Sequence, residues 1–351
     1  MSYDIKRSIS FYSYQDEYYA GILDLEGCLR ECAKTGATGV ELLAEQMIRR
    51  FPKPIEDEAF REKWFADLKK YGLEPSCYDA FLENRIYRNR MLSIGEQVNM
   101  MKRDLYLASL LGFPVIRTLV STPMPVIEGS LEYAEKVGVK IGLEVHAPFS
   151  LNSGWAEGYL SMIRRTGTKY FGFIPDMGIF CRNLPDVVAD KARRMGATEE
   201  GIKVVDEAYA KRVNNGFVKI KYDLDLGKAN FEYRMANGMK EMMEKVGALG
   251  PNPGNEWYAN NSFTYSWSEP QDIIDNIEYI YHTHAKFYDV HEDYKETAVA
   301  LPEVIDAFKK AGYHGFLSSE YEGGEHLRDV GVDSITQVAR HQEAMRRLIE
   351  A

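Results

Sequence analysis

The chain lacks any long apolar run. No window approaches eighteen apolar residues, and the N-terminal stretch MSYDIKRSIS has no apolar segment of the kind that a secretory signal requires. The sequence therefore predicts no membrane partner, and we expect a cytoplasmic protein.

Cysteine is scarce, and an excess of basic charge is absent. Cys28 and Cys32 form the only close cysteine pair, which is neither a disulfide framework nor a zinc-finger spacing and indicates a reducing compartment. The 43 Lys and Arg residues against 53 Asp and Glu residues give a net charge of −10. A phosphate backbone demands a basic protein face, so nucleic acid is not expected as a partner.

No internal repeat and no linker rich in Pro, Gly or Ser divides the 351 residues, which predicts a single domain over residues 1–351. Short β-rich runs alternate with longer helical patterns, as in a parallel sheet with crossover helices. The predicted strands cover residues 5–12, 38–43, 73–80, 114–120, 139–146, 170–176, 279–286 and 315–321. Eight strands in this regular order predict a (β/α)8 TIM barrel, because doubly wound sheets rarely alternate so regularly to the end.

Helical spacing of apolar residues recurs between these strands. The predicted helices cover residues 25–36, with Asp24 as N-cap, and 56–71, 91–111, 127–138, 155–166 and 332–350. About a hundred residues separate strands six and seven, where a few dozen would be typical. We expect 177–278 to be an insertion over the catalytic mouth, with helices at 185–213 and 229–248 and a loop at 251–270.

Charged and imidazole side chains gather at the ends of four consecutive predicted strands, where a TIM barrel places its catalytic residues. Strand five ends in LEVH (143–146), strand six in PD (175–176), strand seven in HTHAK (282–286) and strand eight in SEYEG (319–323). Two glutamates, an aspartate and a histidine form a mixed oxygen and nitrogen donor set that suits Mn²⁺, Mg²⁺, Co²⁺ or Zn²⁺. A lone carboxylate at a strand end is more often solvated or a helix cap, so the prediction depends on all four together.

These four runs resemble the xylose-isomerase-like barrel superfamily of sugar isomerases, ketose epimerases and related enzymes. GATGVELLAEQ (36–46) is similar to the second strand of that family. By position, the resemblance implies one divalent ion, with Mn²⁺ expected first, held by Glu144, Asp176, His284 and Glu320. His282 would lie deeper, as a structural residue or beside the ligands.

The sequence departs from the sugar 3-epimerases of this family at three further positions. Where those enzymes add a Glu, a His and an Arg, this chain has Ser150, Ile179 and Val290, which argues against simple ketose epimerisation.

A base beside the ion would remove the proton α to a sugar carbonyl, while the ion stabilises the resulting enediolate. His146 is the expected base, since imidazole exchanges protons near neutral pH, although a structural histidine is the alternative. Lys286 is expected to support the enediolate or hold a substrate oxygen, unless it only pairs with a ligand carboxylate. Glu41, Arg117 and Tyr12 are weaker candidates for substrate binding.

DIKRSISFYSYQDEYYAG (4–21), the EVH run and the long insertion are similar to the large subunit of bacterial C-glycoside deglycosidases. This resemblance implies cleavage of the carbon–carbon bond between a 3-oxo sugar and an aromatic aglycone. It also implies a small, β-rich partner subunit. The alternatives are a ketose or inositol-type isomerase or epimerase, and a carbohydrate-binding barrel without chemistry. An abasic-site endonuclease is disfavoured by the net charge.

Overall fold

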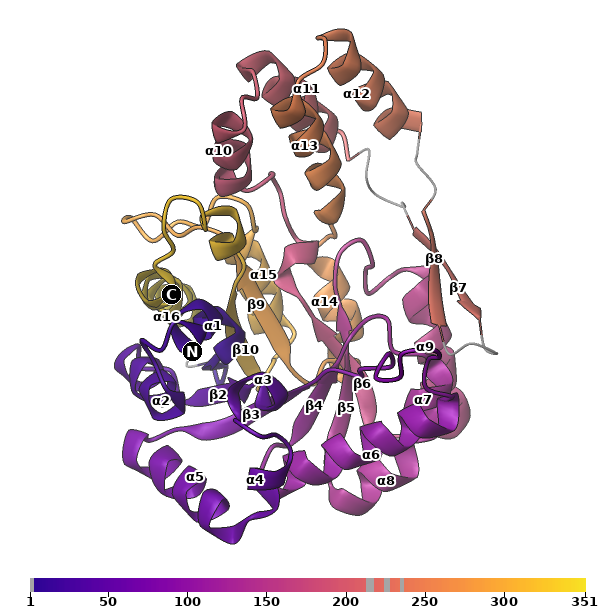
Figure 1. The fold of residues 1–351 in the computed structure, drawn as a ribbon, viewed down its shortest axis with the longest axis vertical. Coiled ribbons are helices and arrows are strands. Elements are labelled where there is room, and N and C mark those ends of the chain that lie inside the picture. Colours follow the sequence, from indigo (N-terminus) through magenta and orange to yellow (C-terminus); the bar gives the residue numbers. More distant parts are fainter. Residues whose placement is uncertain (1–2, 213–217, 224–227, 234–236) are drawn as a thin grey trace.

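Eight parallel strands form the centre of the computed structural model, which describes residues 3–212, 218–223, 228–233 and 237–351 (Figure 1). The barrel strands are β1 (Lys6–Ser10), β2 (Gly39–Leu42), β3 (Glu74–Ala80), β4 (Val115–Thr118), β5 (Lys140–Val145), β6 (Phe171–Pro175), β9 (Thr283–Phe287) and β10 (Phe316–Tyr321). The hydrogen-bonded order runs β6-β5-β4-β3-β2-β1-β10-β9. Two isolated parallel bridges, Phe173 to Ile280 and Asp176 to His284, join β6 to β9 and nearly close the barrel. The predicted TIM barrel is confirmed.

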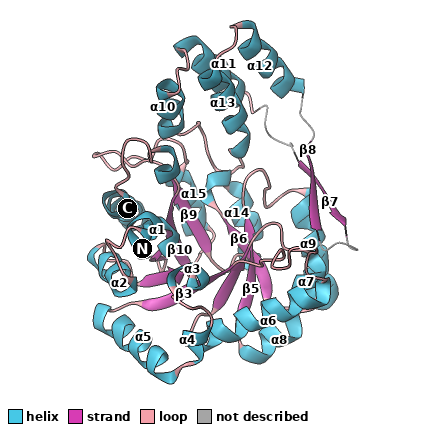
Figure 2. Cartoon of the chain, viewed as in Figure 1, coloured by secondary structure: helices cyan, strands magenta, loops and turns pink. Residues whose placement is uncertain are grey.

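Helices surround the strands (Figure 2). The longer ones are α2 (Leu25–Lys34), α5 (Glu58–Tyr71), α6 (Ile94–Leu110), α8 (Leu131–Val137), α9 (Gly154–Thr166), α15 (Leu301–Lys310) and α16 (Ser334–Glu350). Short helices α1 (Gln15–Tyr19), α3 (Ala44–Met47), α4 (Lys53–Glu56) and α7 (Met124–Glu128) lie in the connections. As expected, the Asp24 carboxylate caps α2 by accepting from the Gly27 amide at 2.7 Å. No helix among the described residues has the length and apolar character needed to cross a membrane.

The barrel interior holds little apolar material. A small cluster of Cys77, Val115 and Ile174, with Tyr281 against it, is separate from the main core that the helices cover. Gly142 makes room for this cluster, because a Cβ there would lie 2.5 Å from Ile174 Cδ1. The remaining interior positions near the carboxyl ends of the strands are polar or charged.

The segment between β6 and β9 rises beyond one end of the barrel (Figure 1). It contains the 3-10 turn η2 (Met177–Ile179), α10 (Asp186–Arg194), α11 (Glu199–Ala210), β7 (Val218–Asp223), β8 (Lys228–Tyr233), α12 (Asn237–Ala248), α13 (Pro253–Asn261), η3 (Ser262–Thr264), α14 (Gln271–Asn276) and η4 (Ile277–Tyr279). On α10, Lys191 and Arg194 donate to the backbone oxygens of Glu325 and His326, which follow β10. The segment therefore lies over the carboxyl ends of the strands.

The helical prediction for 185–213 is confirmed over Asp186–Arg194 and Glu199–Ala210, which form two helices because the chain turns at Gly196 (φ +92°) and Thr198 caps the second. Two other details of the prediction for this segment were wrong. Residues 229–233 of the predicted helix 229–248 belong to strand β8, and residues 213 and 234–236 lie outside the described residues. The predicted loop 251–270 contains α13, which begins at Pro253 after the Asn252 side chain caps it.

Candidate metal centre

Four side chains from β5, β6, β9 and β10 converge inside the barrel. Glu144 lies on β5, Asp176 follows β6, His284 lies on β9 and Glu320 lies on β10. One oxygen or nitrogen atom from each lies within 4.8 Å of those from the other three. The structure thus brings together the four predicted ligands, although their binding to an ion stays a prediction.

Local structure aims each of these groups inward. Asp176 is the N-cap of η2, and its Oδ1 accepts from the Gly178 amide at 2.7 Å, which leaves Oδ2 facing the centre. His284 points its Nδ1 at Glu144 Oε1 (3.1 Å) and Glu320 Oε1 (3.3 Å). Because period-two alternation places residues two apart on the same face, His282, His284 and Lys286 all enter the barrel.

Lys286 lies within the cluster and contacts three carboxylates. Its Nζ is 2.5 Å from Asp176 Oδ2, 3.1 Å from Glu322 Oε1 and 3.5 Å from Glu320 Oε2. Burial disfavours the ammonium, but these carboxylates, Asp176 first, outweigh it and raise the pKa of Lys286 well above its usual range. Lys286 therefore places one positive charge among the predicted ligands, against Asp176 and Glu320, and its contact with substrate stays a prediction.

His146 stands beside the cluster and is partly open to solvent. Its side chain is 38% exposed, and its Nε2 lies 3.8 Å from Asp176 Oδ2. Its Nδ1 lies 2.7 Å from the Ala147 carbonyl oxygen, which can only accept a hydrogen bond. The Nδ1 atom must therefore carry the proton, and in the neutral ring Nε2 is the free base.

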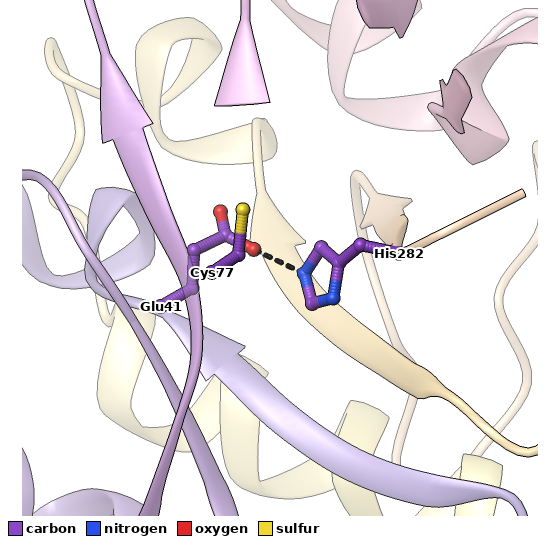
Figure 3. Close-up of side chains that lie close together, drawn as sticks. All are labelled: Glu41, Cys77 and His282. Atoms are coloured by element: carbon purple, nitrogen blue, oxygen red, sulfur yellow. Dashed lines mark hydrogen bonds and ion pairs between the residues drawn. The ribbon is translucent and has the colours of Figure 1, made fainter. Parts of the chain in front are cut away.

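Glu41 lies deeper than the strand-end pattern suggested. Its side chain is fully buried, with Oε2 2.6 Å from His282 Nε2 and Oε1 3.2 Å from His284 Nε2, and its contact with a substrate hydroxyl stays a prediction. Cys77, its register partner on β3, lies beside it (Figure 3). Burial opposes its ionisation, but His284 and His282 outweigh burial and hold the pKa of Glu41 well below its usual range.

The two other predicted substrate residues come from different parts of the barrel, Arg117 from β4 and Tyr12 from the turn after β1. Arg117 is buried, and its Nε donates to Asp79 Oδ1 at 2.9 Å, whereas its Nη1 has no hydrogen-bond partner. Tyr12 follows β1, and burial together with nearby Glu322 and Glu320 raises the pKa of its hydroxyl. Sequence reasoning did not assign a role to Glu322, although its place two residues after Glu320 was a usable signal.

A family model described as xylose isomerase-like TIM barrel matches residues 29–350. A C-glycoside deglycosidase alpha subunit of Arthrobacter globiformis is 28% identical over 348 residues, which cover 99% of this chain and 93% of that protein. A 3'-dehydrocarminate deglycosidase alpha subunit of a Microbacterium species is 26% identical over 97% of this chain and 94% of its own length.

Solved structures show the same fold at low sequence identity. An L-ribulose 3-epimerase matches with a TM-score of 0.52 at 11% identity, over 99% of this chain and 95% of its own. The IOLI protein with a bound zinc atom matches with a TM-score of 0.51 at 12% identity, over 99% of this chain and 98% of its own.

Proposed function

This chain belongs to the xylose isomerase-like TIM barrel family, and from that premise we propose that it is a metal-dependent enzyme that removes a proton α to a sugar carbonyl group. The observation that carries the proposal is the convergence of Glu144, Asp176, His284 and Glu320. The relatives that match nearly the whole chain are named as deglycosidase subunits, which supports an enzyme.

The residues present fit a divalent ion. Buried carboxylates outnumber buried cations among the described residues here: Glu41, Asp79, Glu144, Asp176 and Glu320, with the partly buried Glu322 beside them, face Arg117, Lys286 and the imidazoles. The atoms Glu320 Oε2 and Asp176 Oδ2 are buried without a hydrogen bond of good geometry. Glu144, Asp176, His284 and Glu320 would hold the ion, and their hard oxygen and borderline nitrogen donors suit Mn²⁺, with Mg²⁺, Co²⁺ and Zn²⁺ as alternatives.

A bound divalent ion would supply positive charge beside the carbonyl oxygen that gains electron density when the α-proton leaves. The free Nε2 of His146 would take that proton, because its ring is open to the solvent side of the cluster and is oriented by the Ala147 carbonyl. Lys286, the Tyr12 hydroxyl and the unpartnered Nη1 of Arg117 would hold substrate oxygens. The 177–278 segment would act as a lid within a single 1–351 domain.

The names of the relatives favour one reaction over others. One relative is a 3'-dehydrocarminate deglycosidase alpha subunit, so we propose a 3-oxo-C-glycoside as substrate. His146 would take the C2 proton, the freed electron pair would form the C1–C2 double bond, and the bond from C1 to the aglycone carbon would break. The aglycone carbon would gain a proton. Because the relatives are alpha subunits, we propose a second, small subunit as partner.

The test of the reaction is incubation of Mn²⁺-loaded protein with a 3-oxo-C-glucoside, with and without the small subunit, followed by chromatography of the released aglycone. Free ketoses and inosose-type substrates form the parallel arm. Turnover of those sugars alone would support an isomerase or epimerase instead. Absence of turnover with retained sugar binding would indicate a binding barrel and contradict the proposal.

His146→Ala tests the base. We expect the variant to keep its bound metal and to lose exchange of the substrate α-proton with deuterated solvent by about 100-fold or more, the usual contribution of a general base. Proton NMR of the substrate in D2O measures this exchange. Exchange at the wild-type rate would show that His146 is not the base.

Glu320→Ala tests the metal centre. The variant removes one of the four donors, and we expect the metal content after dialysis to fall well below one ion per chain. Inductively coupled plasma mass spectrometry measures this content. The exposed Glu128→Ala serves as control and should retain the ion, whereas full metal content in Glu320→Ala would contradict the ligand assignment.

A further inference from the structure

Glu41 lies beneath the four predicted ligands and faces two imidazoles at once. Its Oε2 is 2.6 Å from His282 Nε2, and its Oε1 is 3.2 Å from His284 Nε2. Figure 3 shows its carboxylate directed at the His282 ring, with the Cys77 sulfur beside it. The side chain is fully buried, so bulk solvent does not compete for these oxygens.

The opposite nitrogen of His284 faces the predicted metal position. Its Nδ1 lies 3.1 Å from Glu144 Oε1 and 3.3 Å from Glu320 Oε1. Without an ion, Nδ1 donates to Glu144 Oε1, because ionised carboxylate oxygens only accept hydrogen bonds. A bound ion would take the place of that proton, because a ligating imidazole nitrogen must be unprotonated. The ring proton must then be on Nε2, and Glu41 Oε1 is placed to accept a hydrogen bond from that N–H group.

His282 restrains Glu41 from the other side. A glutamate side chain has several rotatable bonds and could turn away from a single partner. The contact with His282 is the shorter of the two contacts of Glu41 and holds the carboxylate in place. Glu41 Oε2 and His282 Nε2 form a hydrogen bond, whereas Glu41 Oε1 and His284 Nε2 lie 3.2 Å apart without a hydrogen bond of good geometry. With Nδ1 of His284 unprotonated, its Nε2–H group would donate to Oε1, and one carboxylate would then accept from both rings.

We propose that Glu41 is a positioning residue that fixes His284 with its proton on Nε2 and its lone pair on Nδ1 toward the ion. The proposal rests on the metal centre put forward above and assigns to Glu41 a role other than substrate contact. A carboxylate behind a ligating histidine orients the ring and strengthens its basicity, and its loss commonly weakens metal binding tenfold to a hundredfold.

The tautomer is measurable in the wild-type protein without any variant. The chain has seven histidines, and selective ¹⁵N-histidine labelling with Zn²⁺ as a diamagnetic probe resolves their ring nitrogens by long-range proton–nitrogen correlation. We expect one ring whose Nδ1 shifts on zinc addition while its Nε2 keeps a directly bonded proton. A zinc-responsive ring that carries its proton on Nδ1, or that binds zinc through Nε2, would overturn the proposal.

Glu41→Gln measures the effect on affinity. The amide matches the carboxylate in shape, but its NH2 group must face one of the two N–H donors, so one ring is forced out of its tautomer. We expect the Mn²⁺ dissociation constant, measured by calorimetry on the full chain, to rise about 10- to 100-fold. Cys77→Ser is the matched control from the same interior layer and should bind Mn²⁺ within about twofold of wild type.

Each outcome separates this proposal from the proposed function. Wild-type affinity in Glu41→Gln would overturn the role of Glu41 and leave the metal centre standing. Weakened Mn²⁺ binding in Cys77→Ser would place the ion in the deeper group of Glu41, Cys77 and His282. That result would also overturn the positioning role of Glu41. A wild-type chain that binds no divalent ion would overturn the metal centre and, with it, the role of Glu41.

Discussion

Arg117 shows how much a single residue contributes to the charged interior. Its guanidinium pairs with Asp79 at 2.9 Å and lies over the Phe81 ring, with both charged groups buried. We expect Arg117→Met to reduce the free energy of unfolding by about 3–5 kcal/mol, because Asp79, whose pKa burial already raises well above its usual range, would lose its cationic partner and would have to stay buried either as an unpaired charge or as a protonated carboxyl. Urea unfolding followed by circular dichroism measures the change.

Two further variants make this prediction specific. Arg165 forms an exposed pair with Glu128, so Arg165→Met should cost about 1 kcal/mol or less. The double variant Arg117→Met with Asp79→Leu should recover most of the lost stability, because it removes both charges together. A double variant as unstable as Arg117→Met alone would show that packing, not the unpaired charge, sets the cost.

The sequence predicted which residues meet at the site better than how deep they lie. Strand-end position was enough to bring the four runs together, because parallel strands of a barrel end at one rim, and the family resemblance selected Glu144, Asp176, His284 and Glu320 within them. It was not enough for Glu41, whose depth depends on the register that pairs it with Cys77 and on the side-chain direction toward His282. Register and rotamer follow from packing across strands, which one sequence does not record.

At the level of elements, periodicity predicted the barrel strands and most of the surrounding helices. It failed inside the long insertion, where β8 was predicted as helix and α13 as loop. In both cases local chemistry competed with the pattern. Helix α13 begins at the Asn252 cap and Pro253, although its apolar residues show little helical periodicity. In the predicted helix 229–248 the apolar residues are spaced as on a helix, but the first part of this range pairs with β7 as strand β8.

The C-terminal helix α16 packs on the barrel through a neutral histidine. His341 stacks on Phe287 of β9 with ring centroids 3.9 Å apart, and its Nδ1 lies 2.8 Å from Ser319 Oγ on β10. Burial lowers the pKa of His341 to about 3. His341 therefore stays unprotonated in the folded protein at pH values where it binds a proton in the unfolded chain, below about pH 6.5.

This difference predicts a loss of stability in mild acid. Between about pH 6.5 and pH 3 the unfolded state binds more protons than the folded state, so stability falls as pH falls, by about 1.4 kcal/mol per pH unit from this group. We expect His341→Phe, which keeps the ring stack, to lose this part of the slope. Urea unfolding at pH 7.5 and 5.5 compares it with wild type and with the exposed His314→Gln, which should keep the wild-type slope. Equal slopes in all three proteins would contradict the assignment.

At the scale of the whole molecule, the candidate metal centre lies where the hydrogen bonding of the barrel is least regular, at the junction between β6 and β9, which we call the seam. Only isolated bridges join β6 to β9 among the described residues, and one of them pairs Asp176 with His284. An ion held by these two residues and by Glu144 and Glu320 would tie β5, β6, β9 and β10 together. Binding to the folded state alone stabilises it by about 2.7 kcal/mol when the free ion is at a hundred times its dissociation constant.

We therefore expect saturating Mn²⁺ to raise the thermal midpoint of the 351-residue chain by about 3–4 °C, given an unfolding entropy of about 2.1 cal/mol/K per residue. Differential scanning calorimetry with and without a chelator measures the shift, and amide hydrogen exchange should slow most on β6 and β9. Glu320→Ala should show no shift, whereas the exposed Glu128→Ala should keep it. A shift of equal size in Glu320→Ala would place the stabilising ion elsewhere on the molecule, away from the seam.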